Sequence, residues 1–457
     1  MDFQDYLVPG KTGLLIGIGG VSMSPLAEVL HDAGLDIRGS DMSESDNTLT
    51  LRERGIPIHI GHSAANVTDD IEFVIRTAAV HDDNPEVHEA HRRGIPVFER
   101  TQAWGALMRG YPNALCISGT HGKTTTTSMC THIMMAAEKD PTVMIGGTLP
   151  LLHACHRVGK GNTIIMESCE YYNSFLSLNP TIAVILNIEA DHLDFFKDIE
   201  DIKHSFRQFA ERVPAETGTV IANCDDVNTM DALRGIERKV ITFGLSPKAD
   251  VYAENIMHRG SSSEFDIYHR GNLFAHVPGI HNVRNALAAT AAAIVLGVSP
   301  NAVKYGLAGF EGAGRRFDYK GKFQGADLYD DYAHHPSELR ALLDAVDTLD
   351  YQRTIVVFQP HTYSRTAKLF NDFVEQLRRP TIVYLAEIYA AREKNTIGIS
   401  SADLAAQIPG AKFYPTFAEI EAELRRIARP GDIILTVGAG DVFRIGEHLL
   451  YPADNKD

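Results

Sequence analysis

The sequence predicts an α/β protein made of three successive domains, each built on a mainly parallel sheet. The chain has 457 residues, and at roughly 100–200 residues per domain this length suits about three domains. Short apolar runs alternate with segments of helical periodicity, which is typical of parallel sheets with crossing helices. Glycine-rich or polar turns directly follow several of the apolar runs, where ligands bind in such folds.

The composition is that of a globular protein and narrows the range of partners. Hydrophobic residues make up 44% of the chain and charged residues 22%, which excludes a disordered chain, a collagen or a disulfide-rich miniprotein. The net charge of −16 gives no general attraction to nucleic acid or anionic membrane, so we expect neither as a partner. The longest apolar stretch, Ala286–Val298, is too short to span a bilayer. No secretory leader is visible and the five cysteines form no C-x-x-C pair, so we expect a cytoplasmic location.

The first block, residues 1–110, is predicted to form a parallel sheet. Leu14–Ile16 is a short apolar strand that stops at the turn Gly17–Gly20. Helical periodicity over 23–30 follows and a glycine ends it. Further strands are expected at 35–37 and 73–75.

The second and third blocks, residues 111–313 and 314–457, repeat this alternation. In the second block we expect strands at 115–117, 163–166, 182–186 and 219–222, a turn between short strands near 259–264, and an alanine-rich helix at 285–296. In the third block we expect strands at 326–329, 354–358, 381–385 and 432–437, with a helix at 339–346.

A glycine-rich loop with a lysine joins the strand at 115–117 to the next helix. Its glycines allow backbone N–H groups to approach a phosphate, and the helix N-terminus adds partial positive charge. Lys123 can neutralise the β- and γ-phosphates, and the Thr124 hydroxyl can bind Mg²⁺. The loop is a shorter variant of G-x-x-x-x-G-K-[ST], because Ile117 stands at the first glycine position. It predicts a nucleotide-phosphate site; an ordinary glycine turn with a surface lysine fits the strand–loop–helix context less well.

Acidic residues and a histidine follow the next two predicted strands. Glu167 and Glu170 come after one strand, and Glu189 and His192 after the other. Ligands bind beyond the carboxyl ends of strands in open α/β sheets, so these side chains can lie beside the phosphate loop and hold Mg²⁺. The alternative is that the acids are helix caps or solvated surface groups. His192 is a less usual magnesium ligand, because Mg²⁺ prefers oxygen.

The first glycine turn, Gly17-x-Gly19-x-x-Ser22, departs from the dinucleotide pattern G-x-G-x-x-G at its third position. Asp41 ends the next strand, where an acid would meet a ribose. The turn therefore predicts a nicotinamide site, a site for the pyrophosphate of another nucleotide, or only a tight turn.

Two polar loops of the third block, Asp330–Pro336 and Phe358–Thr366, also follow strands and should face one crevice. Arg365 can pair with a substrate carboxylate, and Asp330 or Asp331 can accept hydrogen bonds from ribose hydroxyls. The alternative is a cluster of surface histidines.

Motifs along the whole chain resemble those of one family. The central ones are Gly-Thr-His-Gly-Lys-Thr-Thr-Thr from Gly119, Glu-x-x-x-Ser-Phe-Leu from Glu170, Asn-Ile-Glu-Ala-Asp-His-Leu-Asp from Asn187, and His-Asn-x-x-Asn-Ala-Leu-Ala from His281. This set resembles the Mur ligases, ATP-dependent enzymes that form amide bonds in peptidoglycan synthesis. The first glycine turn with Gly-Ser-Asp, the Arg-Arg-Phe segment and the two polar loops of the third block resemble the branch that attaches L-alanine to UDP-N-acetylmuramate. The resemblance runs from about Gly17 to Asp441.

The resemblance implies an N-terminal Rossmann-like domain that binds the UDP-sugar, a central ATP-binding domain, and a C-terminal Rossmann-like domain that binds the amino acid and closes the site. It implies that L-alanine is joined through an acyl phosphate to the lactyl carboxylate of UDP-N-acetylmuramate, with ATP and Mg²⁺ required and ADP and phosphate released. The residues it implies are Gly17, Ile18, Gly19, Gly20 and Asp41 for the UDP-sugar; Gly119, Thr120, His121, Gly122, Lys123, Thr124, Thr125, His281, Asn282, Asn285, Arg316 and Asp331 for ATP; Thr124, Glu170 and His192 for the metal; Lys123, Glu170 and His192 for catalysis; and Tyr332, His334, His361 and Arg365 for the amino acid.

The sequence departs from the family pattern at two places. The segment from Glu167 reads Glu-Ser-Cys-Glu-Tyr-Tyr-Asn, where many members carry Glu-Ala-Asp-Glu-Ser-Asp, so Cys169 removes an acid. Thr362 stands where an arginine is often seen, which leaves Arg365 as the clearest carboxylate anchor.

Other functions compete with this one. A ligase that recycles a whole tripeptide onto the same sugar shares several motifs, and folylpolyglutamate synthetase shares the central architecture. A non-catalytic nucleotide-binding regulator and a nicotinamide oxidoreductase are of other classes. The intact phosphate-loop residues favour a ligase, and we expect Lys123→Ala to lose turnover while folding normally.

Overall fold

The computed structural model describes residues 2–77, 79–193, 195–259, 262–267, 271–275, 278–391 and 393–451. The chain divides into two compact units, Met1–Tyr252 with Asn285–Gly306 and Ala253–Arg284 with Leu307–Asp457. The expected domain limits at 110 and 313 stay predictions.

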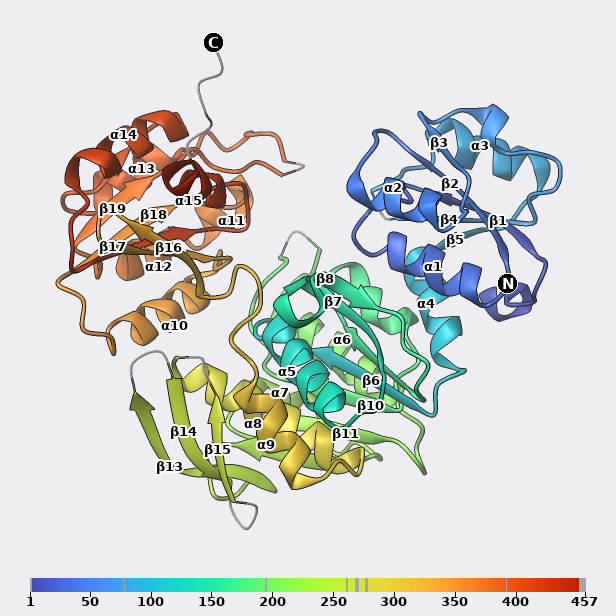
Figure 1. Cartoon of the computed structure of the whole chain (residues 1–457), viewed down its shortest axis with the longest axis horizontal. Helices are drawn as coiled ribbons and strands as arrows, with labels where there is room; N and C mark the ends of the chain where they lie inside the picture. The colour runs from blue at the N-terminus through green and yellow to red at the C-terminus, as the bar shows by residue number, and fades with distance from the viewer. Residues whose placement is uncertain are drawn as a thin grey trace. The chain divides into compact units, whose positions relative to one another are not determined.

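The first unit begins with a parallel sheet in the order β3-β2-β1-β4-β5 (Figure 1). Its elements are η1 Phe3–Tyr6, β1 Thr12–Ile16, α1 Ser24–Asp32, β2 Asp36–Asp41, α2 Asp46–Glu53, β3 Ile58–Ile60, η2 Ala64–Asn66, β4 Phe73–Arg76, α3 Pro85–Arg93, β5 Val97–Glu99 and α4 Arg100–Met108. The predicted parallel sheet and its first strands are confirmed. β1 lies between β2 and β4 and is buried along its whole length, because Leu15 packs in one apolar cluster and Leu14 and Ile16 pack in another.

The same unit contains most of a ten-stranded sheet, with strands in the order β12-β11-β10-β6-β9-β7-β8. Among the described strands of this series, only the β7–β8 pair is antiparallel. Its elements are β6 Asn113–Ser118, α5 Lys123–Ala136, β7 Thr142–Leu149, η3 Pro150–Leu152, β8 Ala154–Arg157, β9 Thr163–Glu167, η4 Tyr171–Ser177, β10 Ile182–Ile185, α6 Ile199–Glu211, β11 Thr219–Asn223, α7 Val227–Ala232, β12 Lys239–Gly244 and α9 Pro300–Ala308. Strands covered on both faces read as continuous apolar runs, which explains why β10 was visible in the sequence.

The central strand β6 lies between β9 and β10 and runs parallel to both. The carboxyl ends of these three strands therefore meet at one edge of the sheet. The glycine-rich loop follows β6, Glu167 ends β9 and Glu170 follows it, and the histidine segment follows β10. This topology brings together the residues that the sequence analysis singled out.

The ten-stranded sheet ends in the antiparallel series β13 Val251–Arg259, β14 Ser262–Ile267 and β15 Gly271–Ala275, and β13 joins it by parallel pairing of Val251 and Tyr252 with β12. The expected turn near 259–264 lies partly at 260–261, outside the described residues. The second unit also contains a sheet in the order β16-β17-β21-β18-β19-β20, which is parallel apart from the β16–β17 pair.

The elements of this last sheet are β16 Asp318–Phe323, β17 Ala326–Asp331, α10 Pro336–Val346, β18 Arg353–Phe358, α11 Tyr363–Lys368, α12 Phe370–Leu377, β19 Ile382–Leu385, α13 Ser401–Gln407, β20 Lys412–Phe413, α14 Phe417–Ile427, β21 Asp432–Val437 and α15 Phe443–Leu450. The strands predicted from the third block are confirmed. Separate apolar clusters pack against the two faces of this sheet.

The alanine-rich helix that the sequence predicts at 285–296 is α8, Ile280–Val295.

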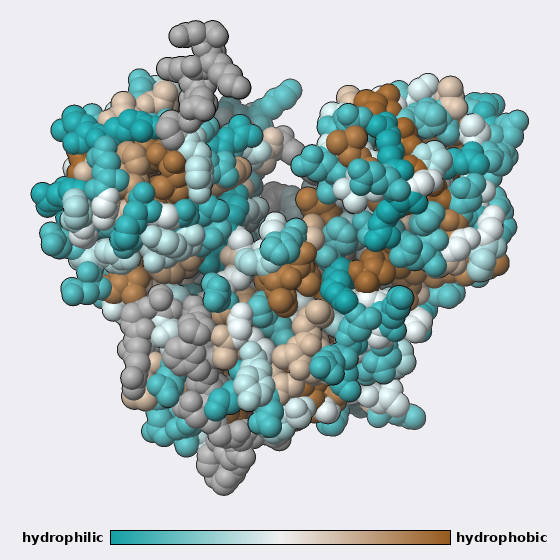
Figure 2. Space-filling view, in the orientation of Figure 1, coloured by the Kyte–Doolittle hydropathy of each residue, from teal (hydrophilic) through white to brown (hydrophobic). Residues whose placement is uncertain are grey.

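The visible surface is mainly hydrophilic, with hydrophobic residues in patches between the polar ones (Figure 2). Among the described residues, no helix has the length and apolar character needed to cross a membrane.

Candidate active site

The phosphate loop takes a shape that only glycine allows at two positions. Gly119 has a φ of +145° and Gly122 a φ of +82°, both in the region that side chains rarely adopt. A Cβ at Gly119 would lie 2.8 Å from the Cβ of Leu186, and one at Gly122 would lie 2.6 Å from Oδ1 of Asn285. The chain then enters α5 at Lys123, so the predicted strand–loop–helix context is confirmed.

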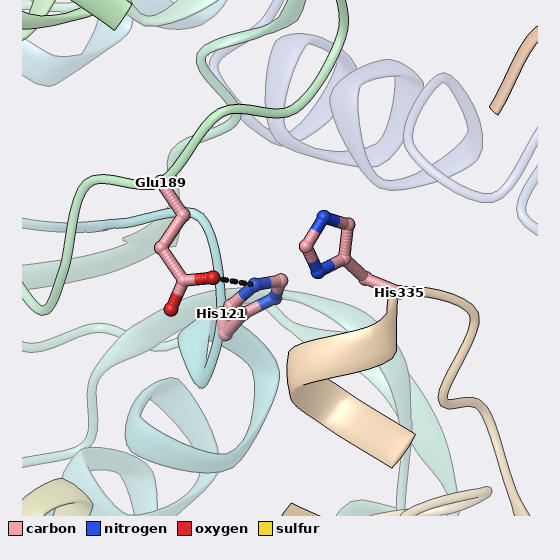
Figure 3. Close-up of side chains that lie close together, drawn as sticks. All are labelled: His121, Glu189 and His335. Atoms are coloured by element: carbon pink, nitrogen blue, oxygen red, sulfur yellow. Dashed lines mark ion pairs between the residues drawn. The ribbon is translucent and has the colours of Figure 1, made fainter. Parts of the chain in front are cut away.

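Asn187, at the end of β10, holds this loop. The backbone N–H of Thr120 donates to the Asn187 carbonyl at 3.0 Å. The His121 N–H donates to Oδ1 of Asn187 at 2.8 Å, and Nδ2 of Asn187 donates back to the His121 carbonyl at 3.1 Å. The Glu189 N–H donates to the Thr120 hydroxyl at 2.8 Å. Figure 3 shows Glu189 beside His121, and the ion pair joins Oε2 and Nε2 at 3.4 Å.

Lys123 forms an ion pair with Glu170 inside the protein. Nζ lies 3.0 Å from Oε2 and 3.3 Å from Oε1, and it also donates to the carbonyls of Gly119 and Thr120. The side chains are only 14% and 3% exposed. Burial is the largest single influence and lowers the pKa of Lys123, but the negative charges of Glu170 and Glu167 and the hydrogen bond to Glu170 act together with other nearby groups and raise that pKa above its ordinary value. The lysine is therefore firmly positive.

The Thr124 hydroxyl donates to Oε1 of Glu167 at 3.0 Å, and the Gly146 N–H donates to Oε2 of the same carboxylate at 2.6 Å. Mg²⁺ binds oxygens at about 2.0–2.1 Å in octahedral geometry, so adjacent ligands stand about 3 Å apart. The Thr124–Glu167 pair has this separation. Glu167 is the last residue of β9, and the sequence already named it with Glu170 as a possible Mg²⁺ ligand. The metal roles of Thr124, Glu167 and Glu170 stay predictions.

His192 lies next to Glu170 but not in hydrogen-bond contact with it. Its Nε2 is 3.7 Å from Oε1 of Glu170 and 3.8 Å from Oδ2 of Asp191. Its ring stacks on Tyr171, with centroids 4.3 Å apart and planes at 21°. Asp194, the last residue of this motif, lies outside the described residues.

Of the remaining nucleotide residues, Thr125 is buried in the first turn of α5 and Asn285 lies against Gly122. His281 and Asn282 lie in the first turn of α8, where Nδ2 of Asn282 donates to the Pro278 carbonyl at 2.8 Å.

The Asp41 carboxylate stabilises the first glycine turn, Gly17–Gly20, by a hydrogen bond to its backbone. The Gly19 N–H donates to Oδ2 of Asp41 at 2.8 Å. The N–H groups of Gly17 and Ile18 both donate to the Ser40 carbonyl, at 2.8 and 3.0 Å, and that of Gly20 donates to the Gly17 carbonyl at 3.1 Å. These residues therefore cluster as expected, but Asp41 here stabilises the turn itself.

In the second unit, Arg315 and the two adjacent aspartates organise the end of β17. Arg315 donates from Nε to Asp330 at 2.8 Å and from its two terminal nitrogens to the carbonyls of Gly440 and Gly438, at 3.0 and 2.6 Å. Asp331 accepts from the Phe317 N–H at 2.7 Å and the Ala333 N–H at 2.8 Å. Burial raises the pKa of Asp331 to about 6.

Arg316, the predicted nucleotide residue, lies over the Tyr332 ring at 4.7 Å. Arg315 lies on the same ring at 4.9 Å. Arg315 is part of the Arg-Arg-Phe segment, but its residue type and position alone did not predict this role.

The four predicted amino-acid residues come together in this unit. His334 lies 5.5 Å from Tyr332 and 5.7 Å from His361, measured between ring centroids. A terminal nitrogen of Arg365 lies 3.2 Å from Nδ1 of His361. The Tyr389 ring stacks on His361, with ring centroids 5.6 Å apart. Tyr389 belongs to none of the motifs recognised in the sequence, so its place in this group was not predicted.

Comparison with known proteins agrees with this arrangement. The family descriptions that match are Mur ligase family, catalytic domain, over residues 15–112; Mur ligase middle domain, over 117–293; and Mur ligase, glutamate ligase domain, over 315–440. The chain is 47% identical over 444 residues to the UDP-N-acetylmuramate–L-alanine ligase of Agathobacter rectalis, covering 95% of this chain and 96% of that one.

It is 44% identical over 458 residues to the enzyme of the same name from Clostridium novyi, covering 98% and 99% of the two chains. The solved structure of the UDP-N-acetylmuramate-alanine ligase of Thermotoga maritima matches with a TM-score of 0.79 at 28% identity, over 96% of this chain and 98% of that one. The chain therefore belongs to the Mur ligase family.

Proposed function

We propose that this protein joins L-alanine to the lactyl carboxylate of UDP-N-acetylmuramate, using ATP and releasing ADP and phosphate. The observation that carries the proposal is the meeting of Lys123, Glu167, Glu170 and His192 at the carboxyl ends of β6, β9 and β10. Relatives that span nearly the whole chain carry the name of this activity. We place the reaction in the cytoplasm, in keeping with the cysteine pattern.

Amide formation needs an activated carboxylate, because carboxylate and amine do not condense in water. A lactyl oxygen attacks the γ-phosphorus of ATP, the bond to the β-phosphate oxygen breaks, and an acyl phosphate and ADP result. The alanine amine then attacks the acyl carbon, and phosphate leaves with the bonding electrons while the nitrogen loses a proton. Both steps move negative charge, which fixed positive groups stabilise.

Lys123 is the fixed positive group in this account. In the structure its ammonium group pairs with Glu170 and donates hydrogen bonds to the carbonyls of Gly119 and Thr120 in its own loop. We infer that it turns towards the β- and γ-phosphates when ATP binds, as phosphate-loop lysines do. The Gly119–Lys123 backbone and the N-terminus of α5 orient the phosphates.

The oxygens of Thr124, Glu167 and Glu170 suit Mg²⁺ in type, and those of Thr124 and Glu167 also in spacing. These residues would hold the metal, which supplies positive charge to the phosphates when bound. His192, beside Glu170, is better suited to orient the lactyl carboxylate than to bind Mg²⁺.

The group formed by Tyr332, His334, His361 and Arg365 would receive the amino acid. Arg365 offers a guanidinium for the alanine carboxylate. His361 lies within reach of that guanidinium and would orient it.

Phosphate release from ATP and magnesium with UDP-N-acetylmuramate tests the proposal. Parallel reactions receive L-alanine, L-Ala-γ-D-Glu-meso-diaminopimelate, or no acceptor. We expect release that depends on L-alanine and a product heavier by one alanyl residue. Release only with the tripeptide would assign recycling instead. No release from folded protein that binds ATP would contradict a ligase and favour a regulator.

A further inference from the structure

An aromatic platform, defined here as Tyr171, Tyr172 and Phe195, borders the candidate active site. Tyr171 lies 4.3 Å from Tyr172, and Tyr172 lies 4.9 Å from Phe195, measured between ring centroids. Tyr171 also stacks on His192 at 4.3 Å. The platform is therefore in direct contact with a residue that we place at the reacting groups.

The outer rings of the platform are open to solvent. Tyr172 is 57% exposed and Phe195 37% exposed. Exposed large apolar groups that gather in one place mark binding surfaces more often than single exposed residues do. The two rings therefore offer aromatic surface for a ligand beside the phosphate loop.

The backbone that carries Tyr172 has an unfavourable conformation, as does that of His192. Tyr172, Asn173 and His192 have φ values of 54°, 55° and 52°, a left-handed conformation that costs about 1–2 kcal/mol for residues with a Cβ. Such conformations persist where the surroundings impose them, and they cluster at functional sites.

Contacts on both sides impose this conformation. The Asn173 N–H donates to the Glu170 carbonyl at 2.8 Å, and the Ser205 hydroxyl donates to the Asn173 side chain. Phe175 is fully buried and stacks on Phe209 at 4.6 Å, which fixes η4 against α6. The segment is thus anchored while Tyr172 remains exposed.

The covalent structure of the substrates determines which of their rings, pyranose, uracil or adenine, can reach the platform. The lactyl carboxylate that receives the γ-phosphoryl group is attached to the pyranose, so this ring must lie close to Lys123, Glu170 and His192 during the reaction. Uracil is separated from that point by a ribose and a diphosphate, and adenine by a ribose and the phosphate chain. Pyranose C–H groups carry partial positive charge and suit the negative face of an aromatic ring.

We propose that Tyr172 and Phe195 form a stacking subsite for the pyranose ring of the sugar nucleotide, with Tyr171 linking this subsite to His192. The proposal rests on the proposed function and names residues that would determine sugar binding. UDP contains the same nucleotide without the pyranose, so it separates this subsite from the rest of the binding site.

The test measures Kd for UDP-N-acetylmuramate and for UDP by calorimetry in Tyr172→Ala, Phe195→Leu and Tyr172→Phe. We expect Tyr172→Ala and Phe195→Leu to weaken binding of the sugar nucleotide, by on the order of 10-fold for Tyr172→Ala. Binding of UDP should stay within about 2-fold, and Tyr172→Phe should behave as the original protein because it keeps the ring. Tyr305→Ala is the matched control, since Tyr305 is 71% exposed on α9, outside the sites described above.

Steady-state kinetics complete the test. The KM for UDP-N-acetylmuramate should rise in Tyr172→Ala, while the KM for ATP stays within about 2-fold. Unchanged sugar-nucleotide binding in a protein that ligates alanine would overturn the subsite alone. A rise in the KM for ATP instead would make the platform an adenine site. Absence of ligation by the original protein would overturn the proposed function and the subsite together.

Discussion

Replacing Lys123 by alanine should reduce folding stability as well as activity. The sequence alone predicted a normally folded variant, because a phosphate-loop lysine is expected to point at its ligand. In the structure the ammonium lies 3.0 Å from Oε2 of Glu170, whose side chain is 3% exposed. Lys123→Ala therefore leaves a buried carboxylate without its closest cation.

The expected loss follows from the cost of such an unpaired charge. Breaking a buried ion pair by removing one partner costs about 3–5 kcal/mol. His192 also lies near Glu170, at 3.7 Å, but it is charged only when protonated. We therefore expect Lys123→Ala to lose about 3 kcal/mol of unfolding free energy or more.

A double-mutant cycle with Glu170→Gln isolates this effect. In Lys123→Ala/Glu170→Gln neither charge of this pair remains, so the double variant should be more stable than Lys123→Ala alone, with a coupling of about 1–3 kcal/mol. Urea unfolding without nucleotide, followed by circular dichroism and by hydrogen exchange in α5, measures it. A loss below about 1 kcal/mol in Lys123→Ala, or no rescue by the second substitution, would refute the reasoning. Turnover should be lost in both variants, because each lacks the lysine.

Three further predictions concern single positions. Gly122→Ala should raise the KM for ATP by on the order of 10- to 100-fold. Gly235 also has a positive φ, but nothing lies within 4 Å of an added Cβ there, so Gly235→Ala should leave the KM for ATP nearly unchanged. Equal effects of the two substitutions would contradict a steric role for Gly122. Arg315→Ala should destabilise the second unit by about 3–5 kcal/mol in urea unfolding. The acidic partners of Arg379 are exposed, so Arg379→Ala should cost less than about 1 kcal/mol. Similar losses in the two variants would contradict a buried ion pair between Arg315 and Asp330. Burial raises the pKa of Asp331 to about 6, above its unfolded value of about 3.9. Its contribution to unfolding free energy is therefore present below about pH 4 and lost as pH rises through about 6, by at most about 3 kcal/mol. Asp331→Asn should remove this part of the pH dependence, and an unchanged profile would reject it.

The strands of the parallel sheets were predictable because burial on both faces makes them continuous apolar runs. Ile182–Ile185 is such a run, and β21 contains another at residues 433–435; both strands are fully buried. The β7–β8 pair was missed, since Ala154–Arg157 is half-buried and carries no apolar pattern. The predicted strands and the observed strands differ by a few residues at their ends, where polar residues continue the hydrogen-bonded pairing beyond the apolar run.

The sequence by itself determined the α/β class, the phosphate loop and which residues carry chemistry, because these depend on residue type and spacing along the chain. The tertiary structure decided the pairings: Lys123 with Glu170, Thr124 with Glu167, and Arg315 with Asp330. It also brought Tyr172 and Phe195 into contact. Partners that are 15 to 47 residues apart meet only because parallel strands bring their carboxyl ends to one edge of a sheet, or because neighbouring loops pack there. Periodicity records which face of an element is buried, but not which side chain of another element lies opposite.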